Sequence, residues 1–155
     1  MIIARSTDAA AAARSRDAVE AARIWARAAA VRDGLAPPSA LASSLAGVER
    51  RLAQGGVLYL ARVGDRAVGF AVLVGPELVY LAVDPDVWGA GVASRLLAHV
   101  DEEALRAGFE SLELWVIDDN VRAKAVYERA GWTPTGDLQD AGGRAERRLV
   151  KQLRA

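Results

Sequence analysis

The chain of 155 residues contains no cysteine and a single histidine, His99. The lack of cysteine excludes disulfides, a thiol nucleophile and cysteine ligands for a metal. One histidine leaves little room for histidine-based catalysis or for a zinc site built on imidazoles. His99 falls on the same expected helix face as Arg95, Glu102 and Arg106, which predicts a solvated side chain rather than a catalytic base.

The sequence also lacks an excess of either charge and lacks a long apolar run. Twenty basic residues balance twenty acidic ones, so no net field favours nucleic acid or a membrane surface. No segment reaches the roughly 20 apolar residues of a membrane-spanning helix. The first residues, MIIARSTD, carry charge too early for a secretory signal. We therefore expect a cytoplasmic protein whose partners include neither nucleic acid nor membrane.

What the sequence does contain is enough apolar surface for one globular domain, residues 1–155, since 52% of the residues are hydrophobic and 26% are charged. Apolar spacing and turn residues predict the order β-α-α-β-β-β-α-β-α-β-β. Three hairpin-linked strands followed by a βαβ crossover predict an α/β fold, a mixed sheet with helices on both faces. The expected elements are Ile2–Arg5, Asp17–Arg32, Ser39–Gln54, Val57–Val63, Ala67–Val74, Glu77–Val83, Val92–Ala107, Ser111–Ile117, the helix from Asn120 to Gly131, Trp132–Asp137 and Arg144–Leu153.

The turn after the strand Glu77–Val83 has the features of an anion site. Gly89 and Gly91 let the backbone approach a ligand, and Gly91 leads into a helix whose first N–H groups lack partners. Alone, this turn fits a plain strand–helix connection, a dinucleotide fingerprint or a pyrophosphate site. The fingerprint fits poorly because Ser94 stands where its third glycine belongs. A Walker A loop is excluded because Gly-Lys-Ser/Thr is absent.

A second segment, LELWVIDDNVRAKAVYERAGW at residues 112–132, predicts a strand, a polar turn and a short helix. Asn120 and Tyr127 lie seven residues apart, which is two helical turns or roughly 10.5 Å along one side. This spacing suits a long, thin ligand such as a thioester on a pantetheine arm. Asn120 could bond an amide midway along it, and Tyr127 could place a phenol at its reactive end. Asn120 is equally a candidate helix cap, and Tyr127 a candidate core residue.

Together the two segments resemble the GNAT family of acetyl-CoA-dependent N-acetyltransferases, closely over about Val57–Trp132 and weakly before it. The family pattern Gln/Arg-x-x-Gly-x-Gly/Ala is matched over Trp88–Ala93, except that Trp88 replaces the usual Gln or Arg. The pattern Asn-x-x-Ala-x-x-x-Tyr-Glu-x-x-Gly-aromatic is matched in full over 120–132. Because Trp88 cannot serve as those side chains do, phosphate recognition would rest on backbone N–H groups, with Arg95 as a candidate cation.

The resemblance implies a GNAT-like fold, in which the strands Glu77–Val83 and Ser111–Ile117 splay apart at their C-terminal ends. It implies acetyl-CoA as the acyl donor and a primary amine of a small molecule or protein as the acceptor. The amine would attack directly in a ternary complex, which suits a chain without cysteine. The implied donor-binding residues are Leu81, Ala82, Val83, Trp88, Gly89, Ala90, Gly91, Val92, Ala93, Ser94, Asn120 and Tyr127.

The catalytic roles also come from the resemblance, and no metal is expected at the site. Tyr127 would be the general acid that protonates the departing thiolate, and a backbone N–H in 81–83 would stabilise the oxyanion. Glu77 stands eleven residues before Trp88, the offset of the base in histone-acetylating members, so Glu77 or an ordered water would accept the amine proton. The segment 31–38 would help to select the acceptor, and its Asp33 is either a partner for a cationic amine or a solvated charge. Trp115 is expected to pack in the sheet rather than line an acceptor pocket.

Three functions stay open at this point. The first is an active N-acetyltransferase. The second is a catalytically silent acyl-CoA-binding module, which Trp88 and the unsettled base allow but an intact Tyr127 argues against. The third, a nucleotide-binding regulatory domain, rests only on Gly89-x-Gly91. Because family members are often dimers through their late strands, a homodimer is a further expectation.

Overall fold

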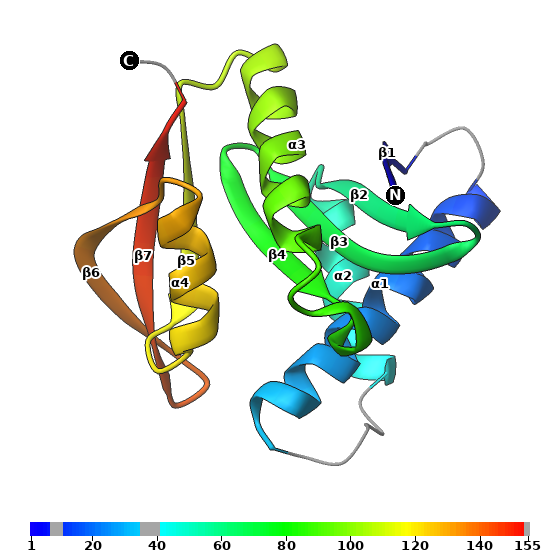
Figure 1. The fold of residues 1–155 in the computed structure, drawn as a ribbon, viewed down its shortest axis with the longest axis horizontal. Helices are drawn as coiled ribbons and strands as arrows, with labels where there is room; N and C mark the ends of the chain where they lie inside the picture. Colours follow the sequence, from blue (N-terminus) through cyan, green and yellow to red (C-terminus); the bar gives the residue numbers. More distant parts are fainter. Residues whose placement is uncertain (7–10, 35–40, 154–155) are drawn as a thin grey trace.

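The computed structural model describes residues 1–6, 11–34 and 41–153, which build one seven-stranded sheet with helices on both faces (Figure 1). The strands and helices follow in the predicted order, with a short 3-10 helix added after the fourth strand. The predicted cap Ser39 and the bend at Pro37-Pro38 lie outside the described residues. The elements are β1 (Ile2–Arg5), α1 (Ala11–Arg32), α2 (Leu41–Ala53), β2 (Val57–Val63), β3 (Arg66–Val74), β4 (Glu77–Val83), η1 (Pro85–Val87), α3 (Val92–Arg106), β5 (Ser111–Ile117), α4 (Val121–Arg129), β6 (Thr133–Ala141) and β7 (Arg144–Gln152).

The sheet runs in the order β1-β2-β3-β4-β5-β7-β6, and only the β4–β5 neighbours are parallel. This mixed sheet confirms the predicted fold class. Figure 1 shows β5, β6, β7 and α4 gathered on one side of the molecule and the remaining elements on the other. The junction of β4 with β5 therefore joins the two halves of the fold.

The β4–β5 junction is short because β4 bends away from its neighbour. The two strands pair through a single pair of residues in register, Glu77 and Glu113. On its other edge, the pairing of β4 with β3 skips Val79, since Leu78 and Tyr80 pair with consecutive residues of β3. An extra residue of this kind is a β-bulge, which bends the strand that carries it. The bulge follows directly after the pair of Glu77 and Glu113, so the strands splay from that point, as predicted.

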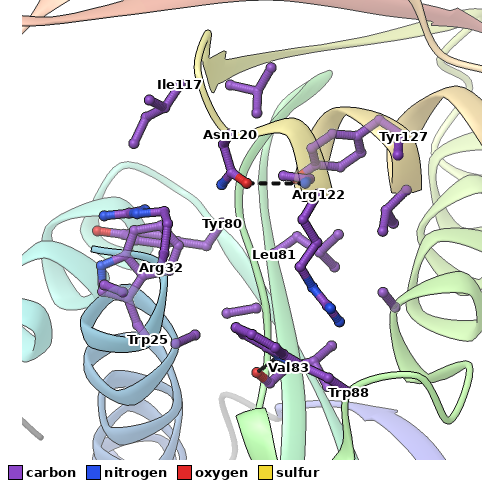
Figure 2. Close-up of a pocket in the computed structure, with 18 of the residues that line it drawn as sticks. Trp25, Arg32, Tyr80, Leu81, Val83, Trp88, Ile117, Asn120, Arg122 and Tyr127 are labelled. Carbon is purple, nitrogen blue, oxygen red and sulfur yellow. Dashed lines mark hydrogen bonds between the residues drawn. The ribbon is translucent and has the colours of Figure 1, made fainter. Parts of the chain in front are cut away.

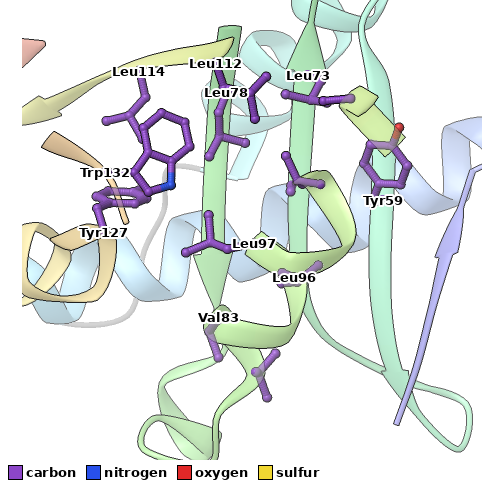
Figure 3. Packing of buried hydrophobic residues seen from close by; sticks show 14 of the residues in the cluster. Tyr59, Leu73, Leu78, Val83, Leu96, Leu97, Leu112, Leu114, Tyr127 and Trp132 are labelled. Carbon is purple, nitrogen blue, oxygen red and sulfur yellow. The ribbon is translucent and has the colours of Figure 1, made fainter. Parts of the chain in front are cut away.

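Two hydrophobic clusters cover the two faces of the sheet. One lies under α1 and α2 and includes Ile24, Val48, Leu52, Leu58, Phe70 and Val72. The other lies under α3 and α4 and reaches across both halves, as Figure 3 shows. Its large members include Tyr59, Leu96, Leu97, Leu112, Leu114, Tyr127 and Trp132. None of the described helices is long and apolar enough to cross a membrane.

Candidate active site

An open cleft of about 1460 Å³ lies where β4 and β5 separate. At one end it is lined by the turn that follows β4 and by α4 (Figure 2). At the other end it is lined by residues of α1, α2 and the start of β7. The cleft is therefore lined by elements from both faces of the sheet. Of the predicted donor-binding residues, all except Ala90 line it.

The edge of β4 offers backbone hydrogen-bonding groups to this cleft. The N–H of Asp84 donates to a β3 carbonyl at 2.8 Å, whereas the Val83 carbonyl accepts from the indole N–H of Trp88 at 2.8 Å. Backbone groups of successive strand residues point to opposite edges. Leu81 and Val83 therefore face the cleft, and Ala82 faces β3. Among the predicted Leu81, Ala82 and Val83, the first and third are placed to bond a ligand through their backbone.

The turn between β4 and α3 forms an anion-binding end for the cleft. Gly89 and Gly91 have φ of 86° and 82°, a left-handed conformation that glycine adopts without strain. Gly91 is the N-cap of α3 and no side chain caps that helix end. The N–H of Ala90 donates to the backbone carbonyl of Val87 at 3.3 Å, so this N–H is already paired within the turn. The free helix N–H groups belong to the next three predicted residues, Val92, Ala93 and Ser94.

A buried carboxylate fixes this turn to the rest of the fold. Asp84 is 4% exposed and accepts from Arg27 at 2.7 Å, from Arg66 at 3.0 Å and from the backbone N–H of Asp86 at 2.9 Å. These bonds connect the turn to α1 and to β3. Local sequence patterns cannot indicate this anchor, because Arg27 lies 57 residues from Asp84 in the chain. The turn is thereby held in one position relative to the strand edge.

Trp88 makes a cation–π contact, not predicted from the sequence, with an arginine of α4 across the cleft. The Arg122 guanidinium on α4 lies over the Trp88 ring, 4.0 Å from its centre (Figure 2). Arg122 was not singled out from the sequence. The predicted cation, Arg95, instead donates to the backbone carbonyl of Met1 at 3.4 Å and does not line the cleft.

Asn120 performs the capping role and keeps a free donor. Its side-chain oxygen accepts from the N–H of Ala123 at 3.1 Å, which caps α4. Its side-chain nitrogen has no hydrogen-bond partner in the part of the chain that the structure describes. Asn120 also lines the cleft. The two predicted roles are therefore compatible in one side chain.

Replacing Asn120 by aspartate should separate these two roles. Aspartate caps helices as well as asparagine, so we expect the free energy of unfolding of Asn120→Asp to change by less than about 0.5 kcal/mol. An ionised carboxylate cannot donate, so the dissociation constant for acetyl-CoA should rise about tenfold. Denaturant unfolding and calorimetric titration measure the two quantities. Asn120→Ala is the control that loses both roles, and unchanged affinity in Asn120→Asp would leave Asn120 as a cap only.

Tyr127 is both a core residue and a cleft residue. It is 9% exposed, belongs to the cluster under α3 and α4, and packs edge-on against Trp132 with ring centres 6.0 Å apart. It also lines the cleft, and its hydroxyl bonds to none of the residues in the ranges described. Burial raises the pKa of the Tyr127 phenol above its ordinary value. The phenol therefore keeps its proton over the whole physiological pH range.

The end of the cleft beside α1 and β7 has an aromatic wall. Trp25 of α1 and Tyr80 of β4 pack edge to face with ring centres 4.8 Å apart, and both line the cleft. Trp115 lines it as well and is only half-buried, which corrects the expectation that it packs within the sheet. The expectation failed because Leu114 and Val116 occupy the buried face of β5, so Trp115 lies on the opposite face, where it lines the cleft.

Charged groups close part of this same end. Asp33 at the end of α1 accepts from Arg144 at the start of β7 at 2.9 Å and from Arg32 at 3.1 Å. The hydrogen bond from Arg32, followed by that from Arg144, lowers the pKa of Asp33 to about 2. Arg144 also lies 3.6 Å from Asp119. Asp33 is thus already paired with arginines, rather than free for an amine or merely solvated.

Glu77 lies at the closed end of the splay and is not among the residues that line the cleft. Burial raises the pKa of its carboxyl group, and the nearby Glu113 and Glu146 raise it further, while Arg51 opposes the shift. Glu146 itself lines the cleft and accepts from Gln139 at 2.8 Å. The structure thus places a second carboxylate, unforeseen from the sequence, at the end of the cleft beside α1 and β7.

The single histidine lies away from the cleft. His99 is half-buried, not solvated, because its ring packs edge-on against Tyr59 at 5.3 Å and lies 3.8 Å from Glu103. It does not line the cleft. Within the described ranges, no group of three or more His, Asp or Glu side chains is placed to hold a metal ion.

Comparison with known proteins decides the family. The model of the acetyltransferase (GNAT) family matches residues 19–132, well over half of the chain. The chain belongs to the GNAT family. The match includes α1 from Val19 onward and all of α2, so the resemblance extends further toward the N-terminus than the motifs alone indicated.

Individual GNAT proteins resemble parts or all of the chain. A mycothiol acetyltransferase of Beutenbergia cavernae is 39% identical over 74 residues, 47% of this chain and 22% of that protein. A peptidyl-lysine N-acetyltransferase of Salmonella typhimurium is 32% identical over 80 residues, 50% of this chain and 52% of that protein. The chain thus spans about half or less of these relatives. The crystal structure of an aminoglycoside 6'-N-acetyltransferase complexed with coenzyme A has a TM-score of 0.73 at 15% identity, covering 100% of this chain and 98% of the other.

Proposed function

We propose that this GNAT chain is an acetyl-CoA-dependent N-acetyltransferase that acts on a primary amine through a ternary complex. The observation that carries the proposal is the cleft between β4 and β5, which opens on both faces of the sheet. Donor and acceptor can therefore bind from opposite ends and meet between the strands. Direct attack needs this arrangement, because both substrates must be present together.

The donor would lie along the end formed by β4, the turn and α4. Its diphosphate would rest on the N–H groups at the start of α3, where the helix dipole also favours an anion. Its pantetheine would bond the backbone of Leu81 at the open strand edge, as an added strand does. The free amide nitrogen of Asn120 would donate to a pantetheine carbonyl. The thioester would then lie near Tyr127.

The proposed reaction is addition of the amine to the thioester carbonyl, followed by loss of the thiolate. The amine nitrogen forms the new C–N bond, and the carbonyl oxygen becomes an oxyanion that a backbone N–H at the β4 edge stabilises. Collapse breaks the C–S bond, and the CoA sulfur takes the phenolic proton of Tyr127. The proton lost by the amine goes to Glu77 through water, or to water alone.

Release of free CoA over a panel of amines tests this proposal. Because the chain has no cysteine, a thiol reagent reports only the CoA that the reaction liberates. We expect release that depends on both acetyl-CoA and at least one amine. Binding of acetyl-CoA without release by any small amine, lysine peptide or protein amino group would favour a silent acyl-CoA-binding module instead.

The lining at the other end of the cleft supports the proposed class of acceptor. Trp25, Tyr80 and Trp115 offer apolar surface and ring faces, and Glu146 offers a negative charge, a combination that suits an ammonium group on an organic body. The name of the peptidyl-lysine relative supports an amino group as the acceptor. Both small amines and lysine side chains belong in the panel.

Replacing Glu77 by glutamine tests the base. Since the pKa of Glu77 is raised, its basic form is lost as the pH falls through a value above the ordinary 4.5. In the wild-type chain we expect kcat/KM to fall as the pH drops through the pKa of Glu77. Glu77→Gln should remove this fall and should lower kcat/KM about tenfold at neutral pH. The decrease in kcat/KM caused by Glu77→Gln should become smaller as the pH approaches the pKa of the amine, because more of the amine is then already unprotonated. Glu146→Gln is the matched comparison, and an unchanged profile in Glu77→Gln would assign the base to Glu146 or water.

Three wider features belong to the same proposal. Residues 1–155 would form one catalytic domain, which the contribution of both motifs and of Trp25, Tyr80 and Trp115 to one cleft supports. The cytoplasm is the proposed location, since acetyl-CoA is an intracellular metabolite. The proposed assembly is a homodimer through β6, one of the two edge strands of the sheet, all of whose residues are exposed.

A further inference from the structure

The strongest unexplained feature of the cleft is the stack of Arg122 on Trp88. The guanidinium lies 4.0 Å from the ring centre, although α4 and the turn after β4 belong to opposite walls. Arg122 is exposed and lines the cleft. No carboxylate among the residues at 1–6, 11–34 and 41–153 pairs with it. An unpaired cation is therefore held at the mouth of the cleft by a ring rather than by a counter-charge.

The stack fixes the position of Arg122 without using its hydrogen-bond donors. A guanidinium stacks through its flat face, so the five N–H donors around its edge stay available. Trp88 is itself held, because its indole N–H donates to the Val83 carbonyl at 2.8 Å. The ring thus acts as a platform that sets the height of the cation above the turn.

The chemistry of the neighbouring turn identifies the ligand. The free N–H groups at the start of α3 and the left-handed glycines Gly89 and Gly91 form a concave donor surface. A planar guanidinium edge matches two phosphate oxygens at once. Because Trp88 occupies the turn position where the family pattern has Gln or Arg, the turn itself supplies no such side chain.

We infer that Arg122, held against the Trp88 ring, binds the diphosphate of the acyl donor from the wall of the cleft opposite the turn between β4 and α3. This inference rests on the proposed function, because it concerns the same acyl-CoA ligand. Arg122 of α4 thus supplies the cationic side chain that the turn does not contain. The diphosphate is then held between the α3 N-terminus on one side and Arg122 on the other, which ties the two walls of the cleft together when the donor binds.

Titration calorimetry with three ligands tests the inference on the full chain. The ligands are CoA, dephospho-CoA, which lacks only the 3'-phosphate, and pantetheine, which lacks all the phosphates and the adenosine. For Arg122→Gln we expect the dissociation constants of CoA and of dephospho-CoA to rise by the same factor, tenfold or more, and that of pantetheine to stay within about twofold. Arg95→Gln removes one charge beside the same turn but off the cleft, and should change none of the three more than about twofold.

Any other result of these titrations would contradict a specific part of the inference. A loss in Arg122→Gln that disappears with dephospho-CoA would assign Arg122 to the 3'-phosphate instead of the diphosphate. An equal loss with pantetheine would mean a structural effect, and no loss with any ligand would refute the contact. If the wild-type chain binds none of the three, the proposed function fails as well.

A double-mutant cycle tests the platform. In Trp88→Gln the stack is gone and a hydrogen-bonding side chain stands in the turn, so the loss of CoA affinity caused by Arg122→Gln should fall to less than about threefold. Equal losses in the two backgrounds would show that Trp88 does not position Arg122.

Discussion

Tyr127→Phe is expected to lower kcat about 100-fold while leaving the dissociation constant for acetyl-CoA within about twofold. Phenylalanine keeps the ring that packs against Trp132 and in the cluster under α3 and α4, so the fold and the donor site should persist. What is lost is the proton for the departing thiolate. The hydroxyl has no partner within the described ranges, so its removal leaves no protein group unpaired.

The pH profile distinguishes an acid from a residue that only packs. Because burial raises the pKa of Tyr127, the wild-type enzyme should lose no activity through this group below about pH 10. The defect of Tyr127→Phe should be smaller with a thioester whose thiol is more acidic, since such a leaving group needs less protonation. Single-turnover measurements report the chemical step directly. Full turnover by Tyr127→Phe with acetyl-CoA would assign the acid to water or to another group.

Trp132→Ala should lower the free energy of unfolding by about 3–5 kcal/mol, the largest stability effect that we expect for a single change. Trp132 is 2% exposed and lies between Tyr127 of α4 and the β5 residues Leu112 and Leu114 (Figure 3). Truncation to alanine removes the side chain that joins α4 to the sheet. The cavity would lie directly behind the proposed acid.

Trp132→Phe is the matched control for that change. The indole N–H of Trp132 is buried and has no hydrogen-bond partner among the described residues. Phenylalanine therefore loses volume but no hydrogen bond, and its cost should be less than half that of alanine. Denaturant unfolding measures both. If alanine and phenylalanine cost the same, Trp132 does not stabilise α4 through ring packing.

Activity below the unfolding transition links this packing to function. At a temperature where Trp132→Ala remains folded, we expect a lower kcat because Tyr127 has lost one wall of its pocket. The affinity for CoA should change less, since the turn after β4 is held by Asp84 and its arginines instead. Unchanged kcat in the folded variant would contradict a positioning role for Trp132.

The order of elements could be predicted because local signals mark it. The bounds predicted for β2, β4 and β5 are those observed, since Gly55-Gly56, Gly75-Pro76 and Gly108 interrupt the apolar runs at their ends. The segment around Asn120 was predicted as a capped helix for a similar reason: capping acts within three residues of the chain. The closing strands were less exact, and β6 extends to Ala141 because pairing with β7, not its own composition, sets its length.

The features that local patterns missed all depend on contacts between distant segments. The bulge at Val79 appears only in the pairing with β3. The anchoring of Asp84 by Arg27 and Arg66, and the stack of Arg122 on Trp88, join side chains far apart in the sequence. Whether a polar side chain faces a cleft is likewise decided by its neighbours in space. The family pattern could therefore indicate a phosphate turn but not the cation that serves it.

Calorimetric titration of the wild-type chain with acetyl-CoA tests the central claim most directly, because the whole account places that donor between β4 and β5. The account predicts saturable heat with about one ligand per chain and a dissociation constant in the micromolar range or below. ATP and NAD should not displace the ligand. Absence of heat at high micromolar acetyl-CoA, or displacement by either nucleotide, would contradict it.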